Sequence, residues 1–201
     1  MKLIENFKLK IENSRGYTLI ELLAVMLVLT AVGTIIGAIF VSALRGGNKS
    51  TTTNDIRQNG NYAITQMSKM IAFAKSFNGI TDFDRVTHTN CVAPEGGAKP
   101  YASVTITSFD DGVTTFSCEK DPKTGTYGAL ASRSGALQPI YLIDTNTINV
   151  FPCNFTCTQA NLFSPITINI NMTLQKQVSS GFSETQTVIP FNTSVTLRNS
   201  P

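Results

Sequence analysis

The chain has 201 residues, of which 42% are hydrophobic and 14% charged, so its length suits one globular domain with an additional, unusually apolar segment. The formal net charge is +3. Residues 1–16 hold four Lys or Arg and two Glu, which leaves 12 basic and 11 acidic side chains for a nearly neutral remainder. A nucleic-acid interface that depends on a basic surface is therefore not expected. The single histidine, His88, argues against a histidine-based metal site or proton relay.

The hydrophobic excess is concentrated in residues 17–44, which contain one charged side chain, Glu21. About 20 apolar residues span a bilayer as a helix, so this segment is long enough to cross a membrane. Lys and Arg are frequent in the leader, residues 1–16, which by the positive-inside rule keeps the N-terminus in the cytoplasm and exports residues 45–201. No small-residue cleavage site of a secretory signal follows the apolar run. We therefore expect a membrane-anchoring helix.

The junction before this helix carries a motif. The run Ser14-Arg15-Gly16-Tyr17-Thr18-Leu19-Ile20-Glu21-Leu22-Leu23 resembles the prepilin processing site of type IV pilins and type II secretion pseudopilins. The resemblance implies that prepilin peptidase cuts between Gly16 and Tyr17, that Tyr17 is then N-methylated, and that the subunit enters a helical filament. Tyr17 stands where Phe is commonest, and the proline of many major pilins is missing from residues 17–44.

Glu21 places a carboxylate in an otherwise apolar segment, and a charged group costs roughly 2.5–3.5 kcal/mol at mid-helix in a bilayer. In one interpretation Glu21 lies near the cytoplasmic interface, reaches water and does little. The other interpretation is favoured because ionisable groups in membrane helices usually have a function. In it, Glu21 forms an assembly salt bridge with the α-amine that cleavage creates on Tyr17 of a neighbouring subunit, as the resemblance implies.

The same segment contains Gly33 and Gly37, a Gly-x-x-x-Gly spacing that lets two helices approach closely in lipid. The glycines are equally compatible with a helix that must become more flexible when it leaves the bilayer for a filament. The sequence leaves both interpretations open.

Residues 45–79 predict a soluble continuation of the helix. Apolar side chains recur there at spacings of three and four and form one face, with Asn54 or Asp55 as a cap and Asn78-Gly79 as a stop. The recurring residues are Ile56, Gly60, Ala63, Ile64, Met67, Ile71 and Ala74. This face needs a sheet to cover it.

Residues 80–201 predict an exported, β-rich head. From residue 85 onward, β-branched and polar residues alternate with a period of two, and Asp110-Asp111-Gly112 predicts a hairpin turn. Strands are predicted over Tyr101–Phe109, Val113–Glu119, Ile140–Ile143, Thr147–Cys157, Ile166–Val178 and Thr187–Arg198, the last two joined as a hairpin through residues 179–183. The economical fold is α+β, with the long N-terminal helix packed on an antiparallel sheet.

The C-terminal run Ile189–Asn199 resembles the end of larger minor pseudopilins, particularly J-type proteins. Together with the processing junction, this second resemblance implies a low-copy subunit that primes assembly or decorates the tip of a filament.

Cys91, Cys118, Cys153 and Cys157 all lie on the side expected to be exported, where disulfides persist. Four cysteines allow three connectivities. In a continuous strand, Cys153 and Cys157 would lie about 13 Å apart, and each would pair with Cys91 or Cys118. A loop at Pro152 would instead allow a Cys153–Cys157 bond. We expect two disulfides and no zinc site, because no Cys-x-x-Cys pair occurs.

The sequence predicts no catalytic residues and no cofactor, because Ser, His88 and Asp form no recognisable nucleophile arrangement. Asp82, Asp84, Asp110 and Asp111 lack the spacing of a calcium loop, and turn chemistry explains them better. We therefore expect no bound metal.

The motif and the composition together predict a structural subunit and not an enzyme. The resemblance implies four partners: prepilin peptidase, other pilin or pseudopilin subunits, the inner-membrane assembly platform and, before assembly, the lipid bilayer. The expected location is the cytoplasmic (inner) membrane, with the head outside the cytoplasm, and then the pilus or pseudopilus.

Three alternatives remain open. A competence-type pilin would bind DNA or a surface through its head, for which the loose cluster Lys99, Lys120, Lys123 and Arg133 offers no strong evidence. A membrane-tethered enzyme would need convergent polar groups that the sequence does not supply. A plain single-span protein is opposed only by the processing junction.

Overall fold

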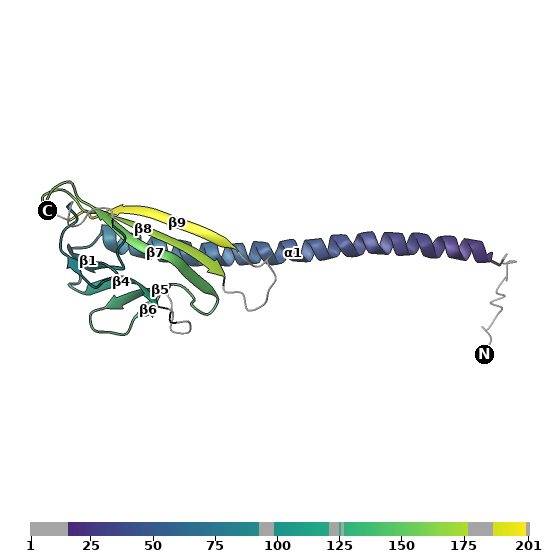
Figure 1. Ribbon diagram of the computed structural model, residues 1–201, viewed down its shortest axis with the longest axis horizontal. Coiled ribbons are helices and arrows are strands. Elements are labelled where there is room, and N and C mark those ends of the chain that lie inside the picture. Colours follow the sequence, from purple (N-terminus) through teal and green to yellow (C-terminus); the bar gives the residue numbers. More distant parts are fainter. Residues whose placement is uncertain (1–15, 93–98, 121–124, 126, 177–186, 200–201) are drawn as a thin grey trace, which may run out of the picture. The chain divides into compact units, whose positions relative to one another are not determined.

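The computed structural model describes residues 16–92, 99–120, 125, 127–176 and 187–199. The leader and the hairpin turn predicted at 179–183 lie outside these residues, apart from Gly16. The chain forms two compact units, Met1–Gly46 and Gly47–Pro201. One helix, α1, runs from Leu19 to Ala72 and contributes to both (Figure 1).

In the first unit, α1 is apolar and uncovered. Every residue from Gly16 to Thr51 is exposed, including most of the large hydrophobic side chains of the chain. By length and composition, α1 is the one described helix that could cross a membrane. An uncovered apolar helix of this kind needs lipid or other helices around it, and it suggests a membrane anchor.

In the second unit, α1 has one buried face. Its buried residues are Thr52, Ile56, Gly60, Ala63, Met67 and Ile71, which confirms the predicted apolar face. The expected helix cap at Asn54 or Asp55 was wrong, because α1 continues through both residues. The Thr and Asn side chains of this polar run bond within the helix instead, as when Thr53 Oγ1 donates to the Lys49 carbonyl oxygen at 2.8 Å and Asn59 Nδ2 to that of Asp55 at 2.9 Å.

The helix ends at Ala72, before the predicted stop at Asn78-Gly79. That dipeptide belongs to strand β1, Ser76–Thr81, which pairs antiparallel with β3, Ser103–Thr107. The register between these strands shifts at Phe77 and Gly79, and Gly79 has a φ of 150°. A glycine that permits positive φ serves a β-bulge as well as a helix terminus, so the same residue pair was compatible with both structures.

The strands form two antiparallel sheets. The six-stranded sheet has the order β2-β1-β3-β4-β5-β6 and the three-stranded sheet the order β7-β8-β9. The remaining bounds are β2 Thr87–His88, β4 Val113–Lys120, β5 Tyr127–Ser134, β6 Ile140–Tyr141, β7 Ile148–Thr158, β8 Thr167–Lys176 and β9 Val188–Thr196. The predicted α+β class is confirmed, although two sheets occur where one was expected. The predicted hairpin turn at residues 110–112 joins β3 and β4, with Asp111 at a φ of 62°.

The core lies between α1 and the sheets. Figure 1 shows β7, β8 and β9 running beside the C-terminal half of α1. Ile56, Met67 and Ile71 of α1 belong to one cluster with buried residues of both sheets. The largest fully buried side chains of the strands and loops include Tyr101, Phe116, Phe155, Leu130, Ile168 and Ile170. An apolar N-terminal helix packed on antiparallel sheets is a pilin-like architecture.

Candidate functional site

The predicted processing junction lies in non-helical backbone directly before α1. Gly16, Tyr17 and Thr18 precede the first helical residue, and Tyr17 is 81% exposed. The Thr18 carbonyl oxygen accepts hydrogen bonds from the backbone N–H groups of Glu21 and Leu22, at 3.0 and 3.2 Å. The Thr18 hydroxyl also accepts from the Glu21 N–H at 3.4 Å. Thr18 is therefore the cap of α1, and the Gly16–Tyr17 peptide bond is exposed and outside any regular element.

Glu21 lies in the first turn of α1 and is exposed. A carboxylate is favourable there because the N-terminal end of a helix carries partial positive charge. The spacing Thr18-x-x-Glu21 is a capping-box signature. Sequence reasoning missed the role of Thr18, although this spacing was the signal that would have revealed it.

Two hydroxyl groups of the apolar segment have partners within the helix. Thr30 Oγ1 and Thr34 Oγ1 donate to backbone carbonyl oxygens three residues earlier, at 2.9 and 2.8 Å. Such bonds remove the cost of placing a hydroxyl in lipid. Around Gly33 and Gly37 an added Cβ would meet nothing within 4 Å, so both interpretations of the glycine pair stay open.

The four cysteines form two disulfides, as predicted. Cys91 pairs with Cys157 and Cys118 with Cys153, with Cα–Cα distances of 5.5 and 5.8 Å. Strand β7 continues past Pro152, with a register shift between Val150 and Cys153, so no loop forms that would bring Cys153 to Cys157. The Cys118–Cys153 bond joins β4 of one sheet to β7 of the other. Both disulfides suggest a domain outside the cytoplasm.

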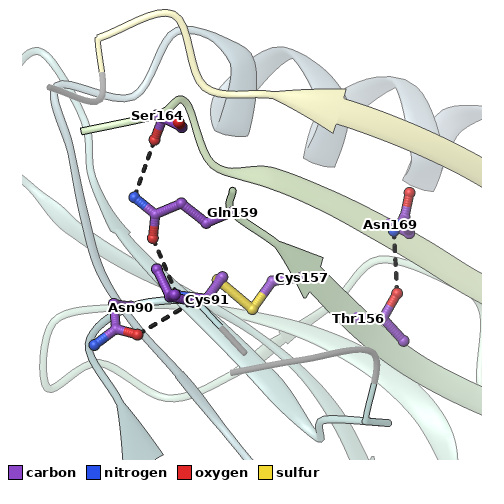
Figure 2. The surroundings of a disulfide bond; sticks show 8 residues. Asn90, Cys91, Thr156, Cys157, Gln159, Ser164 and Asn169 are labelled. Carbon is purple, nitrogen blue, oxygen red and sulfur yellow. Dashed lines mark hydrogen bonds between the residues drawn. A yellow bond between two sulfur atoms is a disulfide. The ribbon is translucent and has the colours of Figure 1, made fainter. Parts of the chain in front are cut away.

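The side-chain amide of Gln159 supports the first disulfide (Figure 2). Its Oε1 accepts a hydrogen bond from the Cys91 backbone N–H at 3.2 Å, and its Nε2 donates to the Ser164 carbonyl oxygen at 3.0 Å. The Gln159 amide thus links the segment around Cys91 to the connection between β7 and β8 by hydrogen bonds.

The aspartates singled out in the sequence act in turns. Asp82 Oδ1 accepts hydrogen bonds from the backbone N–H groups of Asp84 and Val86, at 3.0 and 2.8 Å. Asp110 Oδ1 accepts from the Gly112 N–H at 3.1 Å. These bonds confirm the predicted turn chemistry. Within the described residues, His, Cys, Asp and Glu side chains do not gather in groups of three that would hold a metal ion.

The single histidine lies beside a buried phenol. His88 Nε2 is 3.8 Å from Asp82 Oδ2, and the His88 ring meets the Tyr101 ring edge-on with centroids 5.7 Å apart. Tyr101 is fully buried, and its hydroxyl finds no hydrogen-bond partner among the described residues. Burial raises the pKa of the Tyr101 phenol above its ordinary value, and the nearby Asp82 carboxylate raises it further.

The structure brings together two of the four cations in the predicted basic cluster. Lys120 and Arg133 line one surface depression, which Arg85 also lines. Lys99 is not part of the lining, and Lys123 lies outside the described residues. Two carboxylates share this lining, and one of them accepts a hydrogen bond from Arg133 at 3.3 Å.

Comparisons with models of known protein families, with curated proteins and with solved structures found no match.

Proposed function

We propose that this chain is a minor pilin or pseudopilin, a structural subunit that prepilin peptidase cleaves after Gly16 and that assembles into a helical filament through residues 17–44. The filament is a type IV pilus or a type II secretion pseudopilus. In this proposal the subunit acts by packing rather than by catalysis, and its head primes assembly or decorates the tip. Before assembly, the chain resides in the inner membrane with its N-terminus in the cytoplasm, beside the assembly platform.

The observation that carries the proposal is the structure of the junction. The Gly16–Tyr17 bond is exposed and non-helical, and peptidases need such backbone. Because Thr18 caps α1, cleavage before Tyr17 would leave the cap and the first turn of the helix in place. The uncovered apolar segment that follows contains one carboxylate, which suits a subunit that leaves lipid for a bundle of similar helices.

The first test is the intact mass of the membrane-extracted chain, measured with and without active prepilin peptidase. We expect a chain that begins at Tyr17 and carries one added methyl group when the peptidase is active. A Gly16→Leu variant should stay unprocessed in both samples. A chain that still begins at Met1 in the presence of the peptidase would refute the filament proposal.

A second test addresses Glu21. We expect Glu21→Ala to be processed and inserted normally but to be lost from sheared filaments, because the α-amine of Tyr17 would lose its partner. Thr30→Ala is the matched control, since the Thr30 hydroxyl is bonded within its own helix, and it should assemble normally. Normal assembly of Glu21→Ala would leave Glu21 with a capping role only.

One observation favours a second candidate function, a competence-type pilin that binds DNA. Lys120, Arg133 and Arg85 line one depression, where the carboxylates of Asp82 and Glu119 leave one of their three positive charges in excess. Retention of DNA by the detergent-solubilised chain, falling steeply as salt rises, would support this function. Absence of retention at low salt would exclude it.

A further inference from the structure

A second depression opens next to the one just described and shares Lys120 and Tyr127 with it. It has a volume of about 650 Å³ and is lined by Lys120, Tyr127, Asn149, Phe151 and Gln175. The first two come from β4 and β5 of the six-stranded sheet, and the other three from β7 and β8 of the three-stranded sheet. The site therefore lies where the two sheets of the head adjoin.

Two aromatic rings of this lining are exposed to solvent. Tyr127 is 41% exposed and Phe151 is 67% exposed. Tyr127 is held in place on one side by the edge of the Phe83 ring, with centroids 5.4 Å apart and an interplanar angle of 89°. The Lys120 ammonium lies 5.8 Å from the Tyr127 ring centroid. The exposed parts of both rings can serve as platforms for a ligand.

Two amide side chains complete the lining. Asn149 and Gln175 are directly opposite each other in the β7–β8 ladder, which places both side chains on the same face of the sheet. A carboxamide offers donors and an acceptor in one plane. Asn149 already makes an interaction within the protein, so the amide offered to a ligand is that of Gln175, which is exposed. The depression thus combines apolar rings with a small number of convergent polar groups, which is the composition of a binding site for a small organic ligand.

This composition fits a sugar ring. A pyranose has apolar C–H faces that stack on aromatic rings, and its hydroxyl groups at the rim both donate and accept hydrogen bonds. The Lys120 ammonium adds a charge, because the neighbouring carboxylate of Glu119 is already engaged by Arg133 and by the Ser117 hydroxyl, at 3.3 and 2.8 Å. We propose that this depression binds a saccharide chain that carries carboxylates, with Lys120 selecting the acidic sugar.

The charges argue against a nucleic acid as the ligand of the second depression. In the adjoining depression, the carboxylates of Asp82 and Glu119 offset two of the three positive charges of Arg85, Lys120 and Arg133. A phosphate backbone needs several cations that are not neutralised by the protein itself. The site offers one, Lys120, and a single ammonium suits one carboxylate better than a chain of phosphates. Saccharide binding at this depression does not require the chain to assemble into a filament.

The test is binding to the full chain in detergent micelles, measured by calorimetry and ligand-observed NMR. The probes are tetragalacturonate, cellotetraose as its neutral counterpart, a short oligo-dT and a proline-rich decapeptide. We expect tetragalacturonate to bind in the high micromolar to millimolar range and cellotetraose more weakly. Tyr127→Ala should reduce the affinity about tenfold, and Lys120→Gln should abolish the preference for the acidic sugar.

Two matched variants serve as controls. Phe163→Ala removes an 84% exposed ring from the β7–β8 connection, and Lys99→Gln removes a cation outside both depressions. Neither should change saccharide affinity, and the unfolding midpoints of all variants report that the head is intact. The proposal is overturned if neither saccharide binds at about 10 mM, if Tyr127→Ala binds as well as the unaltered chain, or if oligo-dT or the peptide binds in preference.

Discussion

The phenyl ring of Phe191 in β9 lies directly on the backbone of Gly60 in α1. A Cβ atom added to Gly60 would stand 2.6 Å from both Cε1 and Cε2 of that ring, a separation that real Cβ atoms do not adopt. Gly60 and Phe191 are both buried. The absence of a side chain at Gly60 therefore allows β9 to pack closely against the helix.

We expect Gly60→Ala to destabilise the head by about 1–3 kcal/mol, because overpacking costs more than the gain of up to about 1 kcal/mol in helix propensity. Gly47→Ala is the matched control. It is also in α1, but its added Cβ meets nothing within 4 Å, so it should raise stability slightly. Urea unfolding of the detergent-solubilised variants measures both. Adding Phe191→Leu to Gly60→Ala should recover part of the loss, and a Gly60→Ala variant as stable as Gly47→Ala would contradict the packing argument.

The two disulfides should contribute similarly to stability. They close segments of 66 residues (Cys91–Cys157) and 35 residues (Cys118–Cys153). The chain-entropy relation gives about 4 kcal/mol for each, with the longer loop ahead by about 0.6 kcal/mol. Paired Cys→Ser variants, compared by urea unfolding under oxidising conditions, check this expectation. A much smaller loss of unfolding free energy on removal of either disulfide would mean that the unfolded chain is already compact around that loop.

Tyr101→Phe should leave the head as stable as before or stabilise it by about 1 kcal/mol at pH 7, since it removes a buried hydroxyl without a partner among the described residues. The substitution should also change the alkaline behaviour. The folded state holds the phenol proton more tightly than the unfolded state, because burial and Asp82 raise the pKa of Tyr101. This tighter proton binding contributes its full stabilisation below the pKa of the phenol in the unfolded chain, which is near 10. The stabilisation is lost as the pH rises above that value.

The unaltered head should therefore lose stability above about pH 10 more steeply than the Tyr101→Phe variant. Absorbance at the tyrosinate band should show one late-titrating phenol that the variant lacks. Tyr62→Phe, at an exposed residue of α1, is the control for the loss of a phenol hydroxyl at the surface. Identical alkaline profiles for all three proteins would show that Tyr101 ionises as it does in the unfolded chain.

Thr18→Val should loosen the start of α1, because it removes the hydroxyl that accepts the Glu21 N–H. The expected cost is about 1 kcal/mol, seen as faster amide exchange at Leu19–Leu22 in micelles. Thr18→Asp, which keeps an accepting oxygen at the cap, should exchange like the unaltered chain. Equal exchange in the valine variant would mean that the backbone bonds alone fix the helix start.

The features that sequence predicted well are those with a strong local pattern. The apolar face of residues 45–79 follows the helical period, and Asp111-Gly112 forms the expected hairpin turn. The cysteine pairing depended first on whether the strand continues through Pro152, and a continuous strand still left two of the three connectivities open. The sequence left the first point open, because a proline permits either a loop or an irregular strand position.

The features that were missed depend on distant partners. Strand β5, Tyr127–Ser134, is rich in Gly, Ala and Ser, which have little intrinsic preference for strands. It exists because β4 pairs along nearly its whole length. The depression lined by Lys120, Tyr127, Phe151 and Gln175 has no local signal at all, since its residues come from four strands and two sheets. No periodicity in the sequence brings such residues together.

The nested disulfides also determine how the head would respond to tension. Cys118–Cys153 lies within the segment that Cys91–Cys157 closes, so a force applied through α1 and β9 passes along the outer covalent link. The 66 residues between Cys91 and Cys157 would otherwise provide roughly 220–240 Å of extended chain. In the oxidised head this length does not bear the load, and the segment between Cys91 and Cys157, which contains Lys120, Tyr127 and Phe151, stays attached even when the strands around it are pulled apart.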